Sequence, residues 1–349
     1  MPATAAPDRD PRDQGGPAQP LLIVRDLKRH FPIKGGFLNR AVGTVQAVDG
    51  VSFSVMKGET LGIVGESGCG KSTTARLLMR LIEPDSGEVI FDGEPVGPGG
   101  MPISEMRRQI QMVFQDSYAS LNPRLPVEDS IAFAPTVHGL SKAKARARAR
   151  ELLAAVGLAP EQFARRYPHE LSGGPRQRVN IARALALEPR VIVLDEPVSA
   201  LDKSVEAQVL NLLVDLKRDF GLTYVFISHD LNVVQFISDR VLVMYLGQVA
   251  ELGPVESIYG APRHPYTRAL LASRPSMDPA RRMTEPPLTG DPPNPINPPS
   301  GCRFRTRCAF AEPVCEARPP ALAGEHERDA HRAACHMTAR GSGHGRAPA

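Results

Sequence analysis

GESGCGKS, at residues 65–72, matches the pattern Gly-x-x-x-x-Gly-Lys-Ser/Thr, whose backbone N–H groups close around a phosphate. An apolar run at 60–64 predicts a strand before it, and residues 73–81 predict a helix after it. The glycines allow a tight turn, Lys71 brings positive charge to the terminal phosphates, and Ser72 offers a hydroxyl to Mg²⁺. Strand, loop and helix together predict an α/β domain that binds a nucleotide.

Short apolar runs recur along the chain, separated by stretches long enough for helices. They lie at residues 21–24, 60–64, 110–114, 191–194, 224–227 and 241–245. Runs of this kind are typical of strands that are buried on both faces of a parallel sheet. We therefore expect a parallel sheet that is covered on both faces.

The run at 191–194 ends in two acidic residues, Asp195 and Glu196. Because α/β domains bind ligands at the carboxyl ends of their strands, both side chains are expected near the nucleotide. Asp195 is predicted to hold Mg²⁺, and Glu196 to orient or deprotonate an attacking water. A strand that ends in an acid is common, so this prediction depends on the phosphate loop earlier in the chain.

The composition is that of a soluble globular protein with room for two domains: 349 residues, 42% hydrophobic and 23% charged. A net charge of +4 is too small to indicate nucleic acid as a partner, and the basic residues that alternate with alanine at 142–150 predict a solvated helix. No apolar run approaches the ~20 residues of a membrane span. The first twenty residues do not resemble a secretion signal.

Four of the five cysteines crowd the end of the chain, with the spacing C-x5-C-x6-C-x19-C. These are Cys302, Cys308, Cys315 and Cys335, whereas Cys69 lies alone in the phosphate loop. Without a secretion signal the compartment is reducing, which favours metal ligation over disulfides. Four thiolates suit zinc or an iron–sulfur cluster, and unliganded thiols are a third alternative; the paired Cys-x-x-Cys pattern of zinc ribbons is absent.

Further motifs follow in order and resemble those of the ATP-binding cassette (ABC) family over about residues 21–260. LSGGPRQR at 171–178 is similar to the family signature, usually Leu-Ser-Gly-Gly-Gln. Gln115 fits the Q-loop, SALD at 199–202 the D-loop, and His229 the switch histidine. The resemblance implies an ABC-type ATPase domain with a mixed sheet core and a helical subdomain.

The family resemblance implies two such domains paired head to tail, with two ATP molecules between them. Each ATP then contacts the phosphate loop of one domain and the signature of the other. Helix N-termini attract anions, so the N–H groups at Gly173 and Gly174 suit the second contact. Pro175 replaces the usual Gln, and proline fits the first turn of a helix because its missing N–H would be unpaired there.

The resemblance also implies residue roles. The catalytic group is Lys71, Gln115, Glu196 and His229, and the Mg²⁺ group is Ser72, Gln115 and Asp195. The nucleotide contacts are Phe31, Gly65, Glu66, Ser67, Gly68, Cys69, Gly70, Lys71, Ser72, Thr73, Gln115, Ser172, Gly173, Gly174, Asp195, Asp202 and His229. Phe31 is the candidate to stack on adenine, Phe37 is the alternative, and either could instead pack in the core.

Three segments resemble the ATPase subunits of oligopeptide/dipeptide importers, a group that includes nickel importers. They are QDSYASLNPR at 115–124, HPYTRAL at 264–270 and GCRFRTRC at 301–308. The resemblance implies a peripheral subunit on the cytoplasmic face of the inner membrane. Its partners would be a second ATPase (a paralogue), two membrane-spanning permeases and an extracytoplasmic peptide-binding protein. It also favours [4Fe–4S] over zinc at the four tail cysteines.

Two alternatives remain open: a soluble ABC ATPase of DNA repair or translation, and an importer of nickel or another small solute. The expected organisation is a disordered segment at 1–20, the ATPase domain at 21–260 with its helical subdomain at about 116–188, a helical HPYT segment at 261–281, a Pro-rich linker at 282–299, a small Cys-rich extension at 300–337 and a disordered end at 338–349.

Overall fold

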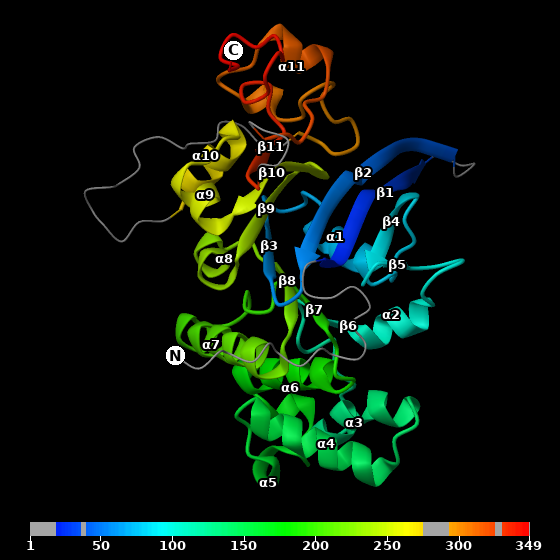
Figure 1. Ribbon diagram of the computed structural model, residues 1–349. Helices are drawn as coiled ribbons and strands as arrows, with labels where there is room; N and C mark the ends of the chain where they lie inside the picture. Colours follow the sequence, from blue (N-terminus) through cyan, green and yellow to red (C-terminus); the bar gives the residue numbers. More distant parts are fainter. Residues whose placement is uncertain (1–18, 36–39, 275–292, 325–329, 349) are drawn as a thin grey trace, which may run out of the picture.

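The central sheet has seven strands in the order β11-β10-β9-β3-β8-β7-β6 in the computed structural model, which describes residues 19–35, 40–274, 293–324 and 330–348 (Figure 1). Its strands are β3 (Thr60–Val64), β6 (Ile110–Val113), β7 (Val191–Asp195), β8 (Thr223–Ile227), β9 (Arg240–Tyr245), β10 (Gln248–Pro254) and β11 (Arg332–Ala333). Neighbours from β9 to β6 run parallel, and β10 and β11 are antiparallel. The expected mixed sheet is confirmed.

Each parallel strand is buried on both faces, which explains its nearly continuous apolar sequence. In β7, Ile192 and Leu194 pack into one core cluster, whereas Val191 and Val193 pack into another on the opposite face. Neighbouring β8 follows the same alternation. Because successive side chains of a strand point to opposite faces, burial of both faces favours apolar residues at nearly every position of these strands.

A second, antiparallel sheet has the order β2-β1-β4-β5 and packs over one face of the central sheet. Its strands are β1 (Pro20–Gly35), β2 (Arg40–Met56), β4 (Ser86–Phe91) and β5 (Glu94–Pro95). The sequence predicted only a short strand at 21–24 here. The longer β1 was missed because only its first part is apolar, while the rest is held by backbone pairing with β2 through several register shifts.

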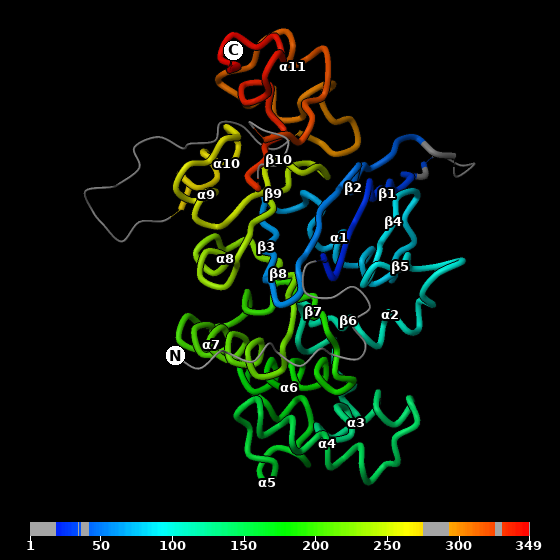
Figure 2. Tube along the Cα trace, viewed as in Figure 1, coloured from blue at the N-terminus to red at the C-terminus, as the bar shows by residue number. Residues whose placement is uncertain are grey.

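The described ranges also contain helices, some packed on the sheets and others set apart from them. They are α1 (Lys71–Leu78), α2 (Ile103–Gln109), α3 (Val127–Val137), α4 (Lys142–Ala155), α5 (Pro160–Phe163), α6 (Gly173–Leu185), α7 (Lys203–Phe220), α8 (Leu231–Ile237), α9 (Val255–Gly260), α10 (Pro265–Ala272) and α11 (Pro313–Ala317). Figure 2 shows α3, α4 and α5 gathered at the end of the molecule opposite the C-terminus.

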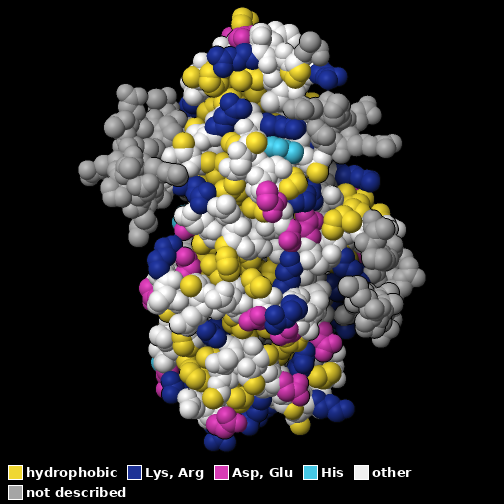
Figure 3. Space-filling model, turned by 60° about the vertical axis from the view of Figure 1, so that its left-hand side comes forward, with side chains coloured by type: hydrophobic (Ala, Val, Ile, Leu, Met, Phe, Trp, Pro, Cys, Tyr) yellow, Lys and Arg dark blue, Asp and Glu magenta, His cyan; other side chains and the backbone are white. Residues whose placement is uncertain are grey.

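The alternating basic stretch forms α4, as predicted. Ala145 and Ala149 face the core, while the long cationic side chains reach outward. Arg146 and Arg150 form ion pairs of 2.8 and 2.9 Å with acidic residues in the first turn of α3. On the face shown in Figure 3, basic and acidic side chains are interspersed along the molecule. In the described ranges, no helix is both long and apolar enough to cross a membrane.

The Cys-rich extension lies against β10 and β2 and contains the 3₁₀ turn η3 (Arg305–Arg307), α11 and β11 (Figure 1). Composition predicted disorder at 338–349, but Ser342 and His344 are buried, and His344 Nε2 lies 2.9 Å from the carbonyl of Phe310. The Ser342 hydroxyl donates a hydrogen bond to the carbonyl of His336 and accepts one from the N–H of His344. Of the disorder predicted at 1–20 and the linker predicted at 282–299, residues 1–18 and 282–292 lie outside the described residues, and β1 already begins at Pro20.

Candidate active site

The phosphate loop joins β3 to α1, and two of its glycines are required by close packing. A Cβ atom at Gly70, where φ is 106°, would lie 2.2 Å from the carbonyl oxygen of Ala47. At Gly65 it would lie 2.3 Å from the carbonyl oxygen of Met244. The helix begins at Lys71, two residues before the predicted start, so its free N–H groups point into the loop.

Lys71 is buried and folds back over the loop. Its Nζ donates hydrogen bonds of 2.7 and 3.0 Å to the carbonyl oxygens of Gly65 and Glu66. Cys69 Sγ lies 3.9 Å from the same nitrogen, and burial raises the pKa of this thiol. The ammonium group therefore stands at the centre of the loop, where an anion would be held.

Ser72 and Asp195 meet where α1 begins and β7 ends. Ser72 Oγ donates a hydrogen bond of 3.0 Å to Asp195 Oδ1. Asp195 is only 3% exposed, and this burial raises the pKa of its carboxyl group against the opposing effect of the Ser72 hydrogen bond. Hard oxygen donors of this kind are the ligands that Mg²⁺ prefers, so the pair fits that ion.

Two of the predicted site residues contact the same carboxylate oxygen of Glu196. Gln115 Nε2 donates a hydrogen bond of 2.9 Å to Glu196 Oε2, and His229 Nδ1 lies 3.3 Å from the same atom. The three residues follow β6, β7 and β8, which are adjacent in the sheet. Glu196 has a φ of 48°, a left-handed conformation that costs free energy and is found preferentially at functional sites.

Most of these residues, although not Asp195, border one cavity of about 490 Å³. It is lined by Val45, Ala47, Ser67, Gly68, Gly70, Lys71, Ser72, Thr73, Gln115, Glu196 and His229. Val45 and Ala47 were not predicted, although their alternate positions in β2 place both on one face. Phe31 pairs with Val45 across the sheet but is not among the lining residues, and its ring packs under the Arg29 guanidinium, 4.9 Å away. Phe37 lies outside the described residues.

The signature residues Ser172, Gly173 and Gly174 are not among the residues that line this cavity. Helix α6 begins at Gly173, and Ser172 precedes it without a side-chain capping bond. A Cβ atom at Gly174 would lie 2.6 Å from Val205 Cγ1, so α6 packs closely against α7. Asp202 caps α7, and the hydrogen bond from the Val205 N–H lowers the pKa of its carboxyl group.

The four tail cysteines border a second, narrow cavity of about 10 Å³. Burial raises the pKa of Cys302 to about 11 and that of Cys335 to about 12, with the neighbouring thiols adding to both shifts. The Cys302 N–H donates a hydrogen bond of 2.7 Å to the carbonyl of Cys315. Within the described ranges, no group of three or more Cys, His, Asp or Glu side chains is arranged to hold a metal ion.

Known proteins resemble both parts of the chain. A family model described as "ABC transporter" matches residues 48–199, and one described as "Oligopeptide/dipeptide transporter, C-terminal region" matches residues 250–315. The "Oligopeptide transport ATP-binding protein AppF" of Bacillus subtilis is 50% identical over 330 residues, which cover 91% of this chain and 97% of the relative. The "Probable peptide ABC transporter ATP-binding protein y4tS" of Sinorhizobium fredii is 51% identical over 323 residues, covering 91% and 90%.

A solved structure supports the same fold. It is the dimeric structure of a post-hydrolysis state of the ATP-binding cassette MJ0796 bound to ADP and Pi. Its TM-score is 0.57 at 31% sequence identity, over 67% of this chain and 98% of that one.

Proposed function

The chain belongs to the family of ATP-binding proteins of oligopeptide ABC transporters, and from this membership we propose that it binds and hydrolyses ATP at the cavity of the phosphate loop to energise peptide import. The observation that carries the proposal is the convergence of Gln115 and His229 on Glu196 beside Lys71. Family membership favours peptide import over the soluble roles in DNA repair or translation.

Different residues of the site bind the phosphates, hold Mg²⁺ and activate the attacking water. Lys71 and the loop N–H groups bind the terminal phosphates, and Ser72 and Asp195 hold Mg²⁺. Bound Mg²⁺ supplies positive charge that offsets the negative charge on the phosphoryl oxygens. Glu196 orients the attacking water and accepts its proton at Oε2.

Gln115 and His229 hold the Glu196 carboxylate in place before the reaction, because both contact the same oxygen. His229 is also expected to donate a hydrogen bond to the γ-phosphate once ATP is bound. Gln115 lies between β6 and α3, the first of the helices at the far end of the molecule. A shift of its side chain would therefore displace the segment that leads into α3. We propose that this residue couples the nucleotide site to the permeases.

A second ATPase subunit, which we propose is a paralogue, completes each site. The support is that Ser172, Gly173 and Gly174 do not line the cavity of their own chain, yet stand at a helix N-terminus suited to an anion. ATP between two subunits would join two such helix ends, and its hydrolysis would release them. A dimeric cassette with ADP and Pi is known for MJ0796.

Replacement of Pro175 by Gln should change the ATPase rate of the complex by less than about tenfold, because proline in the first helical turn removes only an N–H that has no partner. Pro175 lies in the first turn of α6, and the helix forms around it. Steady-state hydrolysis by the Pro175→Gln complex tests this. A rise of about a hundredfold, or ~3 kcal/mol of recovered stabilisation, would mean that the native site is impaired.

The expected assembly is this chain with a paralogous ATPase, two permeases at the cytoplasmic face of the membrane, and an extracytoplasmic peptide-binding protein. Purification of the chain from detergent-solubilised membranes should bring down two polytopic subunits. Peptides presented with the binding protein should then stimulate ATP hydrolysis. Recovery with ribosomes or DNA and without permeases would overturn the proposal, and stimulation by nickel alone would replace peptide as the solute.

We also propose that the four tail cysteines bind a [4Fe–4S] cluster in preference to zinc. The donor set fits, because a cluster takes one thiolate per iron and the four thiols surround one cavity. The tail has no Cys-x-x-Cys pair of the kind that zinc ribbons use, which favours a cluster over zinc. To bind a cluster, the thiols must lose the protons that burial now stabilises.

Anaerobically purified full-length chain should be brown and contain about four iron atoms per chain. Cys335→Ala should lose most of this iron, whereas Cys69→Ser, which alters the cysteine outside the tail, should keep it. Iron and acid-labile sulfide are assayed together with the visible spectrum. A colourless sample with stoichiometric zinc, or full iron content in Cys335→Ala, would contradict the proposal.

A further inference from the structure

The Cys-rich extension reaches directly into the phosphate loop through Arg307. Its guanidinium forms a two-point ion pair with Glu66, the second residue of the loop, with distances of 2.8 and 3.1 Å to the two carboxylate oxygens. The Arg307 side chain is only 5% exposed and that of Glu66 23% exposed, so the pair is largely shielded from solvent. Paired, planar contacts of this kind fix position as well as charge.

The same loop residue is held from a second side. The backbone N–H of Glu66 donates a hydrogen bond of 3.0 Å to the hydroxyl of Tyr266 in α10. The ring of Tyr266 packs against Tyr245 and Phe304, with ring centroids 4.6 and 5.4 Å apart. Phe304 belongs to the tail, so the tail, α10 and the loop form one packed unit around Glu66.

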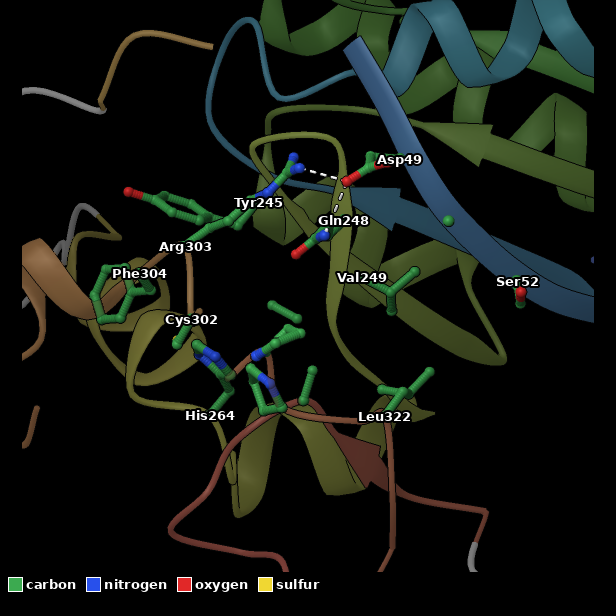
Figure 4. A pocket seen from close by; sticks show the side chains of 15 residues that line it. Asp49, Ser52, Tyr245, Gln248, Val249, His264, Cys302, Arg303, Phe304 and Leu322 are labelled. Carbon is green, nitrogen blue, oxygen red and sulfur yellow. Dashed lines mark hydrogen bonds and ion pairs between the residues drawn. The ribbon is translucent and has the colours of Figure 1, made fainter. Parts of the chain in front are cut away.

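A second tail arginine anchors this unit to the body of the protein. Figure 4 shows Arg303 reaching from the tail, beside Phe304, toward Asp49 at the rim of a cavity of about 220 Å³. Arg303 also donates hydrogen bonds to the carbonyl of Leu246 and to Gln46 in β2. Arg303 and Arg307 are four residues apart in one short segment, which is therefore held at both ends.

We propose that the Cys-rich extension completes the nucleotide site, with Arg307 as a positioning residue that neutralises Glu66 and holds the loop in its anion-binding shape. This inference rests on the proposed ATP site. Lys71 Nζ donates to the Glu66 carbonyl, so the position of Glu66 also sets the position of the lysine. Without Arg307, an unpaired carboxylate would stand beside the site of the triphosphate and repel it.

Arg307→Ala in the full-length chain should weaken ATP binding by about fivefold, the scale of coupling between groups in contact. The assembled complex should show a raised KM for ATP with kcat within about twofold of the unaltered value, because Arg307 does not touch the reacting atoms. Arg305→Ala is the matched control, since its ion pair with Glu316 stays within the tail. ATP affinity is measured by displacement of a fluorescent ATP analogue.

A second substitution separates the charge from the packing. In Arg307→Ala combined with Glu66→Gln, no unpaired carboxylate remains, and ATP affinity should return to within about twofold of the unaltered chain. A double variant as weak as Arg307→Ala would mean that Arg307 only packs, and unchanged affinity in the single variant would remove its role; either result overturns the inference. An unaltered chain that fails to bind ATP would instead overturn the proposed function.

Discussion

Glu196→Gln is expected to lower ATP hydrolysis by about a thousandfold while ATP binding stays intact, because the amide cannot accept the proton of the attacking water. The amide also keeps the size of the carboxylate, so Gln115 can still contact the side chain. Binding is carried by Lys71 and the loop, which this variant leaves unaltered. With binding retained and hydrolysis blocked, ATP should hold the two ATPase subunits together.

The measurement has two parts: phosphate release from the purified complex, and subunit pairing in the presence of Mg-ATP by size-exclusion chromatography. Glu151→Gln is the matched control. Glu151 is an exposed residue of α4 that pairs with Arg148, and neither residue lines the cavity. The control should hydrolyse ATP at the unaltered rate. Hydrolysis at that same rate by Glu196→Gln would assign the proton to another group.

The parallel strands and the loop were predictable because local physics specifies them. A strand buried on both faces must be apolar throughout. Residue 70 must be glycine, because a Cβ atom there would lie 2.2 Å from the carbonyl oxygen of Ala47. The role of the two acids at the end of β7 was predictable because parallel sheets bind ligands at the carboxyl ends of their strands. Residue types and their spacing along the chain were enough to predict these features.

The contacts between distant segments were not predictable in this way. Glu66 and Arg307 are 241 residues apart, and nothing in either segment indicates the other. Val45 and Ala47 line the cavity although neither residue type indicates a nucleotide contact, whereas the stacking role of Phe31, which pairs with Val45, stays a prediction. Both outcomes depend on how β1, β2 and the tail pack together. That packing cannot be inferred from the types of the residues.

Lys71→Ala is expected to weaken ATP binding by about a hundredfold, the scale of losing hydrogen bonds to a charged group, and to reduce hydrolysis below detection at ordinary ATP concentrations. Lys71 is the cation at the centre of the loop, and its Nζ contacts loop carbonyls and the Cys69 thiol. Those neutral acceptors can be exchanged for phosphate oxygens, which bind an ammonium group more strongly.

Lys217→Ala is the matched control, since it removes a lysine of α7 whose ion pair with Asp239 lies outside the cavity. Thermal unfolding of both variants checks that the fold survives. Read together with Glu196→Gln, the result separates binding from chemistry: one variant should hold ATP without cleaving it, and the other should fail to hold it. If Lys71→Ala bound ATP as the control does, the triphosphate would have to lie elsewhere, and the carboxylate of Glu196 would have no water to activate.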